Sequence, residues 1–278
     1  MSNRTQNTTL IVGGTGKTGR RVAERLEARG APVRIGSRSG APPFDWEDRA
    51  TWAPALRGAT SAYVSYFPDL AVPGAPEAIA AFTEVALENG TRRLVLLSGR
   101  GEQEAQRAER VLQESGADWT IVRCSWFSQN FSESFFLEPV LAGEVALPAG
   151  NVGEPFVDVE DIADVAAVAL TEDGHVGQLY ELTGPRLLRF DEAVEEIARA
   201  AGRPIRYVPI SIGEFTAGLA QDGVPDDIVS FLGYLFTEVL DGRNAQLADG
   251  VQRALGREPR DFADFARRAA EAGVWDGR

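Results

Sequence analysis

A glycine-rich loop near the start of the 278-residue chain constrains the fold more than any other segment. The loop, Gly13-Gly14-Thr15-Gly16-Lys17-Thr18-Gly19, directly follows the apolar run Leu10-Ile11-Val12. A helical pattern from Arg20 to Arg29 comes next, and Gly30 ends it. A strand, a tight turn and a helix in this order are typical of phosphate sites, because the first N–H groups of the helix are free to donate hydrogen bonds. The loop therefore predicts an α/β fold that binds a nucleotide.

Two kinds of phosphate loop compete for this segment. Gly16-Lys17-Thr18 matches the end of a P-loop, but the earlier glycine that a P-loop requires is replaced by Ile11. Gly13, Gly16 and Gly19 instead follow the spacing of a dinucleotide loop, in which the glycines allow a tight turn, close approach of the pyrophosphate and close packing of the helix. We therefore expect a dinucleotide cofactor to contact the following residues of the loop: Gly13, Thr15, Gly16, Lys17, Thr18 and Gly19.

The end of the second predicted strand, Pro32 to Gly36, bears on the choice between NAD and NADP. An NAD site usually has an acidic residue here, about 20 residues after the loop, that binds the ribose hydroxyls. No acidic residue occurs from Pro32 to Pro43, and the strand is followed by Ser37 and Arg38. A guanidinium group can hold a 2′-phosphate through paired hydrogen bonds, and Lys17 adds positive charge nearby. The pattern favours NADP(H), and the alternative is that Arg38 is an ordinary solvated arginine.

Strand and helix patterns alternate through the first half of the chain, which is typical of a parallel sheet with helices on both faces. The predicted strands are 8–12, 32–36, 60–66, 93–97 and 119–123, and the predicted helices are 17–29, 50–56, 75–89 and 102–115. Beyond residue 124 we expect strands at 156–159, 178–182 and 206–209, helices at 159–170 and 191–201, and mostly helix over 212–274. We predict a Rossmann-type doubly wound parallel sheet in residues 1–124, with elements at about 155–182 returning to it, and a smaller, partly helical C-terminal substrate lobe in 125–278.

Composition argues against several classes of function. The formal net charge of −13 disfavours nucleic acid, because affinity for its phosphates comes largely from lysine and arginine. One cysteine, Cys124, and one histidine, His175, allow no internal disulfide and no cysteine- or histidine-rich metal cluster. The longest apolar runs are too short to span a membrane, and the polar segment Met1 to Thr9 lacks the core of a signal peptide. We expect a cytoplasmic protein that binds no metal and no membrane.

Several loose motifs follow one another in a characteristic order. They are Gly13 to Gly19, Ser37-Arg38, Phe44-Asp45-Trp46, Leu94 to Gly99, Ile121-Val122-Arg123, Gln129-Asn130, Pro155 to Asp161, Leu182-Thr183-Gly184-Pro185 and Gly256-Arg257-Glu258-Pro259. In this order they resemble an atypical short-chain dehydrogenase/reductase of the NmrA-like group, which includes NADPH quinone reductases, over nearly the whole chain. The resemblance implies that Phe44 and Asp45 lie near the adenine of the cofactor, and that Tyr66, Phe67 and Pro68 lie near the nicotinamide.

The position of the single lysine removes the usual catalytic machinery of this superfamily. Ordinary members use a serine, which Ser98 matches, and a tyrosine followed four residues later by a lysine that lowers the pKa of the tyrosine. Lys17 is the one lysine of the chain, and none of the five tyrosines has a lysine four residues later. The tyrosine–lysine dyad is therefore absent, which leaves Ser98 and Tyr66 as the candidate catalytic donors to a substrate oxygen.

The missing dyad restricts the chemistry that is reasonable. Reduction of a ketone forms a strongly basic alkoxide, and a positioned acid accelerates such a step by about 10² to 10⁴. Reduction of a quinone forms a delocalised, phenolate-like anion whose conjugate acid titrates near pH ~10, so its proton can come from water. The sequence thus favours quinone reduction over simple carbonyl reduction. It is equally compatible with a non-catalytic protein that senses NADP, as in some members of the resembled group.

Aromatic residues gather after the strand predicted at 119–123. Trp126, Phe127 and Phe131 can stack on a flat aromatic substrate, and Gln129 and Asn130 can orient its oxygens. For any single ring, the alternative is an ordinary place in the core. Further rings that could close the pocket are Phe135, Phe136, Phe215, Phe231, Tyr234 and Phe236.

We therefore expect an NADPH-dependent reductase that delivers hydride to a quinone-like aromatic molecule. A polycyclic polyketide quinone is one such substrate, and oxygen activation with net hydroxylation is one extension of the chemistry. The partners expected are the aromatic small molecule and either a second copy of the chain or a partner protein. The alternative is a regulatory NADP sensor of NmrA type.

Four other side chains receive structural interpretations. Cys124 is expected to be a buried apolar residue, because no histidine lies near it in the sequence. Asp158 and Asp161 are expected to anchor the helix that starts at Val159, and Asp191 is a plausible N-cap. The loop composition around His175 predicts a surface position without a role.

Overall fold

The computed structural model describes residues 8–277, which form two compact units. The first unit contains the described residues up to Cys124, together with Val159–Leu182 and Asp249–Arg257. The second contains Ser125–Asp158, Thr183–Ala248 and the described residues from Glu258 onward. Residues 1–7 of the polar segment that suggested a cytoplasmic protein lie outside the described part. Between residues 8 and 277, no helix has the length and apolar character needed to cross a membrane.

The first unit is built on a six-stranded parallel sheet in the order β2-β1-β3-β4-β5-β7. The strands are β1 Thr8–Val12, β2 Val33–Gly36, β3 Ala59–Val64, β4 Arg93–Gly99, β5 Asp118–Cys124 and β7 Gln178–Leu182. Central strands of such a sheet are covered on both faces and therefore need near-continuous apolar sequence, and Leu10, Ile11 and Val12 of β1 are fully buried. The predicted doubly wound parallel sheet is confirmed.

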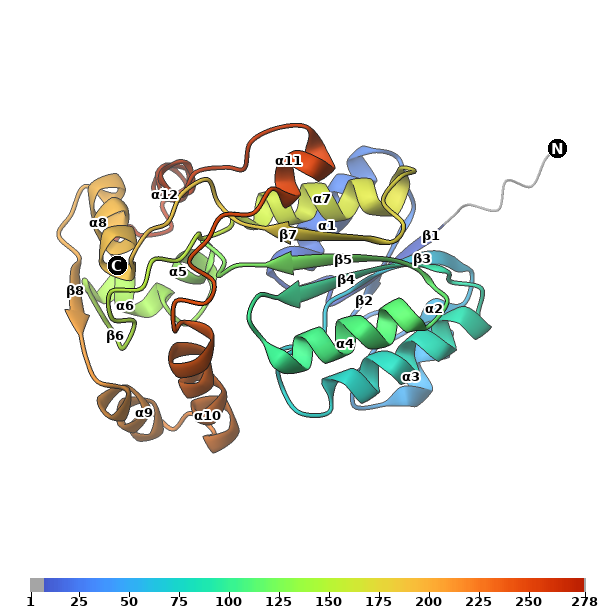
Figure 1. Cartoon of the computed structure of the whole chain (residues 1–278), viewed down its shortest axis with the longest axis horizontal. Helices are drawn as coiled ribbons and strands as arrows, with labels where there is room; N and C mark the ends of the chain where they lie inside the picture. Colours follow the sequence, from blue (N-terminus) through green and yellow to red (C-terminus); the bar gives the residue numbers. More distant parts are fainter. Residues whose placement is uncertain (1–7, 278) are drawn as a thin grey trace. The chain divides into compact units, whose positions relative to one another are not determined.

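Helices cover both faces of this sheet (Figure 1). The helices on one face are α1 Lys17–Ala28, α7 Val159–Thr171 and α11 Gly250–Leu255, and those on the other are α2 Trp52–Leu56, α3 Ala75–Glu88 and α4 Gln103–Glu114. A short 3-10 turn, η1 Arg49–Thr51, precedes α2. Because β1 pairs with β2 on one side and with β3 on the other, the strand order reverses at β1. Doubly wound sheets bind their ligands at the carboxyl ends of the strands beside such a reversal.

The second unit has a small parallel pair of strands, β6 Glu144–Leu147 and β8 Arg206–Pro209. Its helices are α5 Asn130–Glu133, α6 Leu137–Ala142, α8 Phe190–Ala201, α9 Ile212–Gln221, α10 Asp226–Tyr234 and α12 Phe262–Glu271, and a π-helical turn, η2 Leu235–Val239, continues α10. Its core is unusually aromatic, with closely packed rings from Phe131, Phe136, Phe156, Phe190, Phe262 and Trp275.

The structure differs from the sequence-based expectations at several places beyond residue 124. Residues 156–159 form no strand: Val157 makes only an isolated bridge to Phe127. Strand β6 was not expected, because its four residues carry too short a pattern. Residues 249–257 belong to the first unit, where Gly250 packs so closely that a Cβ would lie 2.2 Å from the carbonyl oxygen of Glu181.

Two expectations about single side chains are also corrected. Helix α8 begins at Phe190, so Asp191 lies in its first turn, and the N-cap is Arg189, whose backbone N–H donates to the carboxylate of Glu192 at 2.8 Å. His175 is buried rather than exposed. Its Nδ1 lies 2.9 Å from the hydroxyl of Tyr180, and this hydrogen bond replaces the one that the ring would make with water.

Candidate functional site

The glycine loop after β1 is held in a tight, closed turn. Gly13 has a φ of 72°, a left-handed conformation that favours glycine. Its N–H donates to the carbonyl of Gly36 at 3.1 Å, and the N–H of Gly16 donates to the carbonyl of Gly13 at 2.9 Å. A Cβ on Gly14 would lie 2.9 Å from both the Ile11 carbonyl and the Ile35 side chain. The backbone thus forms a cradle that side chains would fill.

Helix α1 starts inside this loop, with Gly16 as N-cap and no acidic residue in its first turn. A Cβ on Gly19 would lie 2.3 Å from the carbonyl oxygen of Gly13, so only glycine lets the helix approach the loop this closely. Thr15 and Gly16 are exposed and Lys17 is half-buried, whereas Thr18 is buried. The accessible N-terminus of α1 therefore fits the pyrophosphate of a dinucleotide, which it would hold through backbone N–H groups and the helix dipole.

The turn after β2 presents an exposed guanidinium group. The carbonyl of Ser37 accepts from the N–H groups of Gly40 at 3.0 Å and Phe44 at 2.9 Å, which fixes the turn. Arg38 is exposed at its tip and forms no ion pair with any other residue that the structure describes. The side chain that the sequence links to a 2′-phosphate is thus available to a ligand.

Asp45 directly follows this turn and is held by hydrogen bonds of its own backbone and side chain. Its carbonyl accepts from the indole N–H of Trp52 at 2.7 Å, and its carboxylate accepts from the backbone N–H of Glu47 at 3.1 Å. Phe44 is buried against Trp52. The half-buried Asp45 is held by the chain's own contacts, and its role beside an adenine stays a proposal.

Tyr66 and Phe67 follow the carboxyl end of β3, and the glycine loop follows the carboxyl end of the parallel strand β1. Both segments therefore lie at the same edge of the sheet. The indole N–H of Trp46 donates to the carbonyl of Ser65 at 3.2 Å, and the Trp46 ring lies 4.9 Å from the Tyr66 ring. Burial and the nearby charge of Glu47 raise the pKa of Tyr66, so its phenol is protonated at neutral pH. Phe67 is 69% exposed. Its ring is free to contact a ligand, and Tyr66 remains a candidate donor.

Ser98 is part of a buried polar network. Its hydroxyl donates to Oε1 of Glu109 at 2.6 Å, and the Nε of Arg123 donates to the same oxygen at 2.9 Å. The second guanidinium nitrogen of Arg123 pairs with Oε2 of Glu109 and holds the carboxylate in a bidentate contact. The single hydroxyl hydrogen of Ser98 is therefore directed at Glu109, and Ser98 is not free to donate to a substrate as the sequence suggested.

Sequence reasoning gave no role to Glu109 and Arg123, although a signal was present. Glu109 occupies the apolar face of α4 with Ala105, Ala108 and Leu112, all of them buried. A carboxylate on such a face needs a partner in the core. The buried position of Glu109 in the helix pattern predicts a cationic partner. Only the fold shows that this partner is Arg123 of β5.

In the second unit, Trp126 and Phe131 belong to the aromatic core. The Trp126 ring stacks on Phe136 with 6.3 Å between centroids and an angle of 1° between planes. Phe131 is fully buried, and its carbonyl accepts from the indole N–H of Trp275 at 2.9 Å. For Phe131 the structure favours the alternative of an ordinary core position, whereas Trp126 keeps part of its surface exposed.

Phe127 and Asn130 are half-buried at the start of the same unit. Phe127 forms its bridge with Val157, and the backbone N–H of Asn130 donates to the Phe127 carbonyl at 3.0 Å. The neighbouring Gln129 is buried, and its amide donates to Oδ1 of Asp158 at 2.7 Å, so it is engaged within the protein. Phe127, Asn130 and Trp126 therefore remain the proposed substrate residues.

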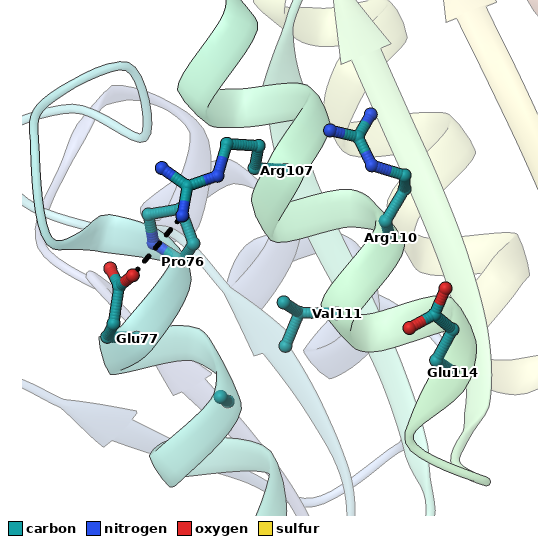
Figure 2. A pocket seen from close by; sticks show the side chains of 7 residues that line it. Pro76, Glu77, Arg107, Arg110, Val111 and Glu114 are labelled. Atoms are coloured by element: carbon teal, nitrogen blue, oxygen red, sulfur yellow. Dashed lines mark hydrogen bonds and ion pairs between the residues drawn. The ribbon is translucent and has the colours of Figure 1, made fainter.

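A groove between α3 and α4 is lined mainly by charged side chains (Figure 2). Its lining residues are Pro76, Glu77, Ala80, Arg107, Arg110, Val111 and Glu114. Arg107 pairs with Glu77 across it at 3.3 Å. The groove contains none of the loop or strand-end residues described above, and no chemistry is assigned to it.

The fold and the glycine loop define a dinucleotide-binding protein of the Rossmann class. A family model described as NAD(P)H-binding matches residues 13–173, so the chain belongs to that family. The chain is 33% identical to the uncharacterized oxidoreductase YesF of Bacillus subtilis (strain 168), with 97% of each chain covered. It is 29% identical to the NAD(P)H azoreductase of Xenophilus azovorans, with 95% of this chain and 98% of the relative covered.

A solved structure has the same fold. The NADPH-dependent quinone oxidoreductase of Escherichia coli, in complex with NADPH, aligns with a TM-score of 0.78 at 21% identity, covering 94% of this chain and 99% of the other. The family match identifies NAD(P)H as the cofactor, and the shared fold agrees with the resemblance to atypical short-chain dehydrogenases. The chain is thus a member of an oxidoreductase family whose relatives include an NAD(P)H azoreductase and clavine dehydrogenases.

Proposed function

We propose that the protein is an NADPH-dependent reductase that transfers hydride to a conjugated, quinone-like aromatic acceptor. The observation that carries this proposal is the exposed Arg38 beside a cradle that fits a pyrophosphate, in a chain with no acid near the end of β2. The guanidinium supports binding of a 2′-phosphate, and thus NADPH rather than NADH.

We infer the chemical class of the acceptor from the hydroxyl donors that the chain lacks or has already engaged. The tyrosine–lysine dyad is absent, and the hydroxyl of Ser98 is committed to Glu109 at 2.6 Å. A conjugated acceptor spreads the charge that hydride transfer creates, so it depends less on a strong hydroxyl donor than a ketone does. The azoreductase and the quinone oxidoreductase among the similar proteins support acceptors of this kind.

Several finer features of the function stay proposals of the same kind. Phe67 and Tyr66 are proposed to lie against the nicotinamide, and Trp126, Phe127 and Asn130 to contact the acceptor. A polyketide quinone substrate, oxygen activation and hydroxylation have no counterpart among these relatives, and the proposal does not include them.

The test is oxidation of NADPH, followed spectroscopically, with menadione and an anthraquinone as acceptors. We expect turnover with at least one of them and weaker turnover with NADH. Firm binding of NADPH without turnover of any acceptor would contradict the enzyme and favour the NADP-sensing alternative. Equal use of NADH and NADPH would contradict the cofactor preference.

A further inference from the structure

Glu102, at the turn that follows β4, is a buried carboxyl group whose environment the proposed reaction has not explained. The residue is about nine-tenths buried, and its Oε2 has no hydrogen-bond partner among the described residues. Buried side-chain oxygens normally have one, so an orphaned oxygen indicates a ligand or a function.

The chain folds so that this carboxyl lies directly on the last residue of β4. A Cβ on Gly99 would lie 2.1 Å from Oε2 and 2.3 Å from Cδ of Glu102. Gly101, with a φ of 75°, turns the chain back to bring the carboxyl there. Glu102 is the N-cap residue of α4, yet its side chain makes no capping hydrogen bond. The Glu102 side chain therefore does not stabilise the start of α4 as an N-cap side chain can, and it packs against Gly99 instead.

The site lies at the carboxyl edge of three neighbouring strands. Gly99 ends β4 and pairs in register with Cys124, which ends β5. Asp69 follows β3, and its Oδ1 accepts from the backbone N–H of Ala71 at 2.9 Å. In an open parallel sheet this edge is where ligands bind. Glu102 thus lies at the ligand-binding edge of the sheet.

The groups that act on Glu102 favour its neutral form. Burial raises the pKa of Glu102 well above its usual range, and the carboxylates of Asp69 after β3 and Glu109 on α4 raise it further. Cys124 on β5 is a buried thiol whose own pKa is raised well above its usual value. Lys17 acts on Asp69, and Arg123 is bound to Glu109. The buried Arg100, two residues away, is paired with Glu181 at 2.5 Å. No cation is among the groups that shift the pKa of Glu102, so its surroundings favour the neutral carboxyl.

We propose that Glu102 is the general acid of this reductase and donates a proton to the acceptor atom that hydride transfer makes basic. This inference rests on the proposed reductase function. The acceptor gains a hydride, with its two electrons, from NADPH, which becomes NADP⁺. The O–H bond of Glu102 breaks while an O–H or N–H bond forms on the acceptor. The resulting carboxylate is repelled by Asp69 and Glu109, so it recovers a proton from solvent.

A general acid at this position widens the range of acceptors that the chain can reduce. Loss of the tyrosine–lysine dyad no longer means loss of every acid near the reacting atoms. Acceptors whose reduced anions are more basic than a phenolate, including azo compounds, come within reach.

The variant Glu102→Gln tests this role because it keeps the shape of the side chain and removes the acidic proton. Glu114→Gln, at the exposed end of the same helix, is the matched control. Two acceptors are compared, and both receive hydride from NADPH. An azo dye such as methyl red gains a strongly basic nitrogen anion on hydride transfer and therefore needs a proton, whereas a cationic triarylmethane dye becomes neutral by accepting hydride alone.

We expect Glu102→Gln to lower kcat with the azo dye at least about tenfold and to leave reduction of the triarylmethane dye within about twofold of the wild type. Equal losses with both acceptors would show a structural role, and no loss with the azo dye would show no role; either result overturns the assignment. A wild-type protein that oxidises NADPH with neither acceptor contradicts the proposed function itself, which separates the two failures.

A second readout needs no turnover. In the cofactor-free protein labelled with ¹³C-glutamate, the Glu102 carboxyl signal is identified by its loss in Glu102→Gln. We expect it to titrate well above the ordinary glutamate value of about 4.3. Asp69→Asn should move that midpoint down, because it removes a neighbouring negative charge. An ordinary titration value would overturn the inference.

Discussion

Arg38 is the exposed side chain that we propose sets the preference for NADPH. Backbone hydrogen bonds to the Ser37 carbonyl fix the turn that carries Arg38. The backbone position of Arg38 therefore does not depend on contacts of its guanidinium group. Its interaction with a phosphate would replace water on both groups with paired, charge-assisted hydrogen bonds. Such bonds contribute about 1.5–3 kcal/mol of binding free energy.

Arg38→Ala is therefore expected to raise the KM for NADPH about 10- to 100-fold and to leave the KM for NADH nearly unchanged. Arg57→Ala, which removes another exposed arginine of the same unit, is the control and should change neither value. Initial-rate kinetics or calorimetry with both cofactors provides the measurement. An unchanged NADPH affinity in Arg38→Ala would contradict the phosphate contact.

The polar network around Glu109 makes a second prediction at the residue scale. Glu109 is 3% exposed and Arg123 is 21% exposed, so loss of Arg123 leaves a buried carboxylate without its cation. Removal of one partner from a buried pair costs about 3–5 kcal/mol, and Arg123→Ala should lower the free energy of unfolding by the lower end of that range. Ser98→Ala removes one hydrogen bond and should cost about 1 kcal/mol. Denaturant unfolding checks both values.

The control for this pair is Arg107, one of two exposed arginines on α4. Arg107 bonds Glu104 at 2.7 Å, but the guanidinium is about half exposed. Exposed pairs contribute about 0–1 kcal/mol, so Arg107→Ala should change stability little. A loss as large as that of Arg123→Ala would mean that burial does not explain the difference.

At the scale of elements, the packing of α1 on the glycine loop decides whether the cradle forms. A Cβ on Gly19 would lie 2.3 Å from the Gly13 carbonyl oxygen, and backbone atoms cannot give way as a flexible side chain does. Gly19→Ala must therefore move the helix or open the loop. We expect a loss of about 1–3 kcal/mol of stability and a weaker affinity for NADPH.

Gly218→Ala provides the matched comparison for that substitution. Gly218 lies within α9, and no atom stands within 4 Å of a Cβ placed there. Alanine in a helix interior is favoured over glycine by about 1 kcal/mol, so this variant should be slightly more stable and should bind NADPH normally. Thermal unfolding and cofactor titration of the two variants separate two effects. One is the clash of a Cβ at residue 19 with the Gly13 carbonyl, and the other is the general preference of helices for alanine over glycine. Equal behaviour of the two would exclude the close approach as the cause.

For the molecule as a whole, stability should fall toward both ends of the pH range. The pKa of Asp261 is lowered, mainly by its hydrogen bond from Arg186, so its stabilising contribution is present above about pH 3.9 and is lost as pH falls through the folded-state value. The pKa of Glu102 is raised, so its contribution is complete below about pH 4.3 and is lost as pH rises through the folded-state value.

Urea unfolding from about pH 3 to about pH 9 tests these opposite signs. Asp261→Asn should reduce the slope of the free energy of unfolding against pH at acidic pH. Glu102→Gln should reduce that slope at higher pH. Either variant can also change the maximum stability. The slope is the readout, because Asp261 also accepts from the N–H of Ala263 at 2.8 Å and its loss lowers the whole curve. A Glu102→Gln profile with the same slope as the wild type above about pH 4.3 would contradict the raised pKa of Glu102.

The regular elements of the first unit were predictable because each carries its own local signal. Strands β1 and β4 are apolar runs of strand length, and α3 ends near Gly90 as expected. The predictions were weaker where an element depends on distant partners. The short β6 exists because it pairs with β8, which lies about sixty positions later in the sequence and carries no mark of that pairing.

The residues of the candidate site divide in the same way. The glycine loop, the missing acid after β2 and the solitary Lys17 can be recognised from the sequence, because turn geometry and residue identity act over a few neighbouring positions. The commitment of Ser98 to Glu109 and the carboxyl of Glu102 on Gly99 arise only when the chain folds back on itself. The order of residues therefore determined the cofactor class and the absent dyad. Tertiary packing decided which hydroxyl donates within the protein and which carboxyl is shifted toward its neutral form, because burial and charge depend on neighbours that only the fold brings together.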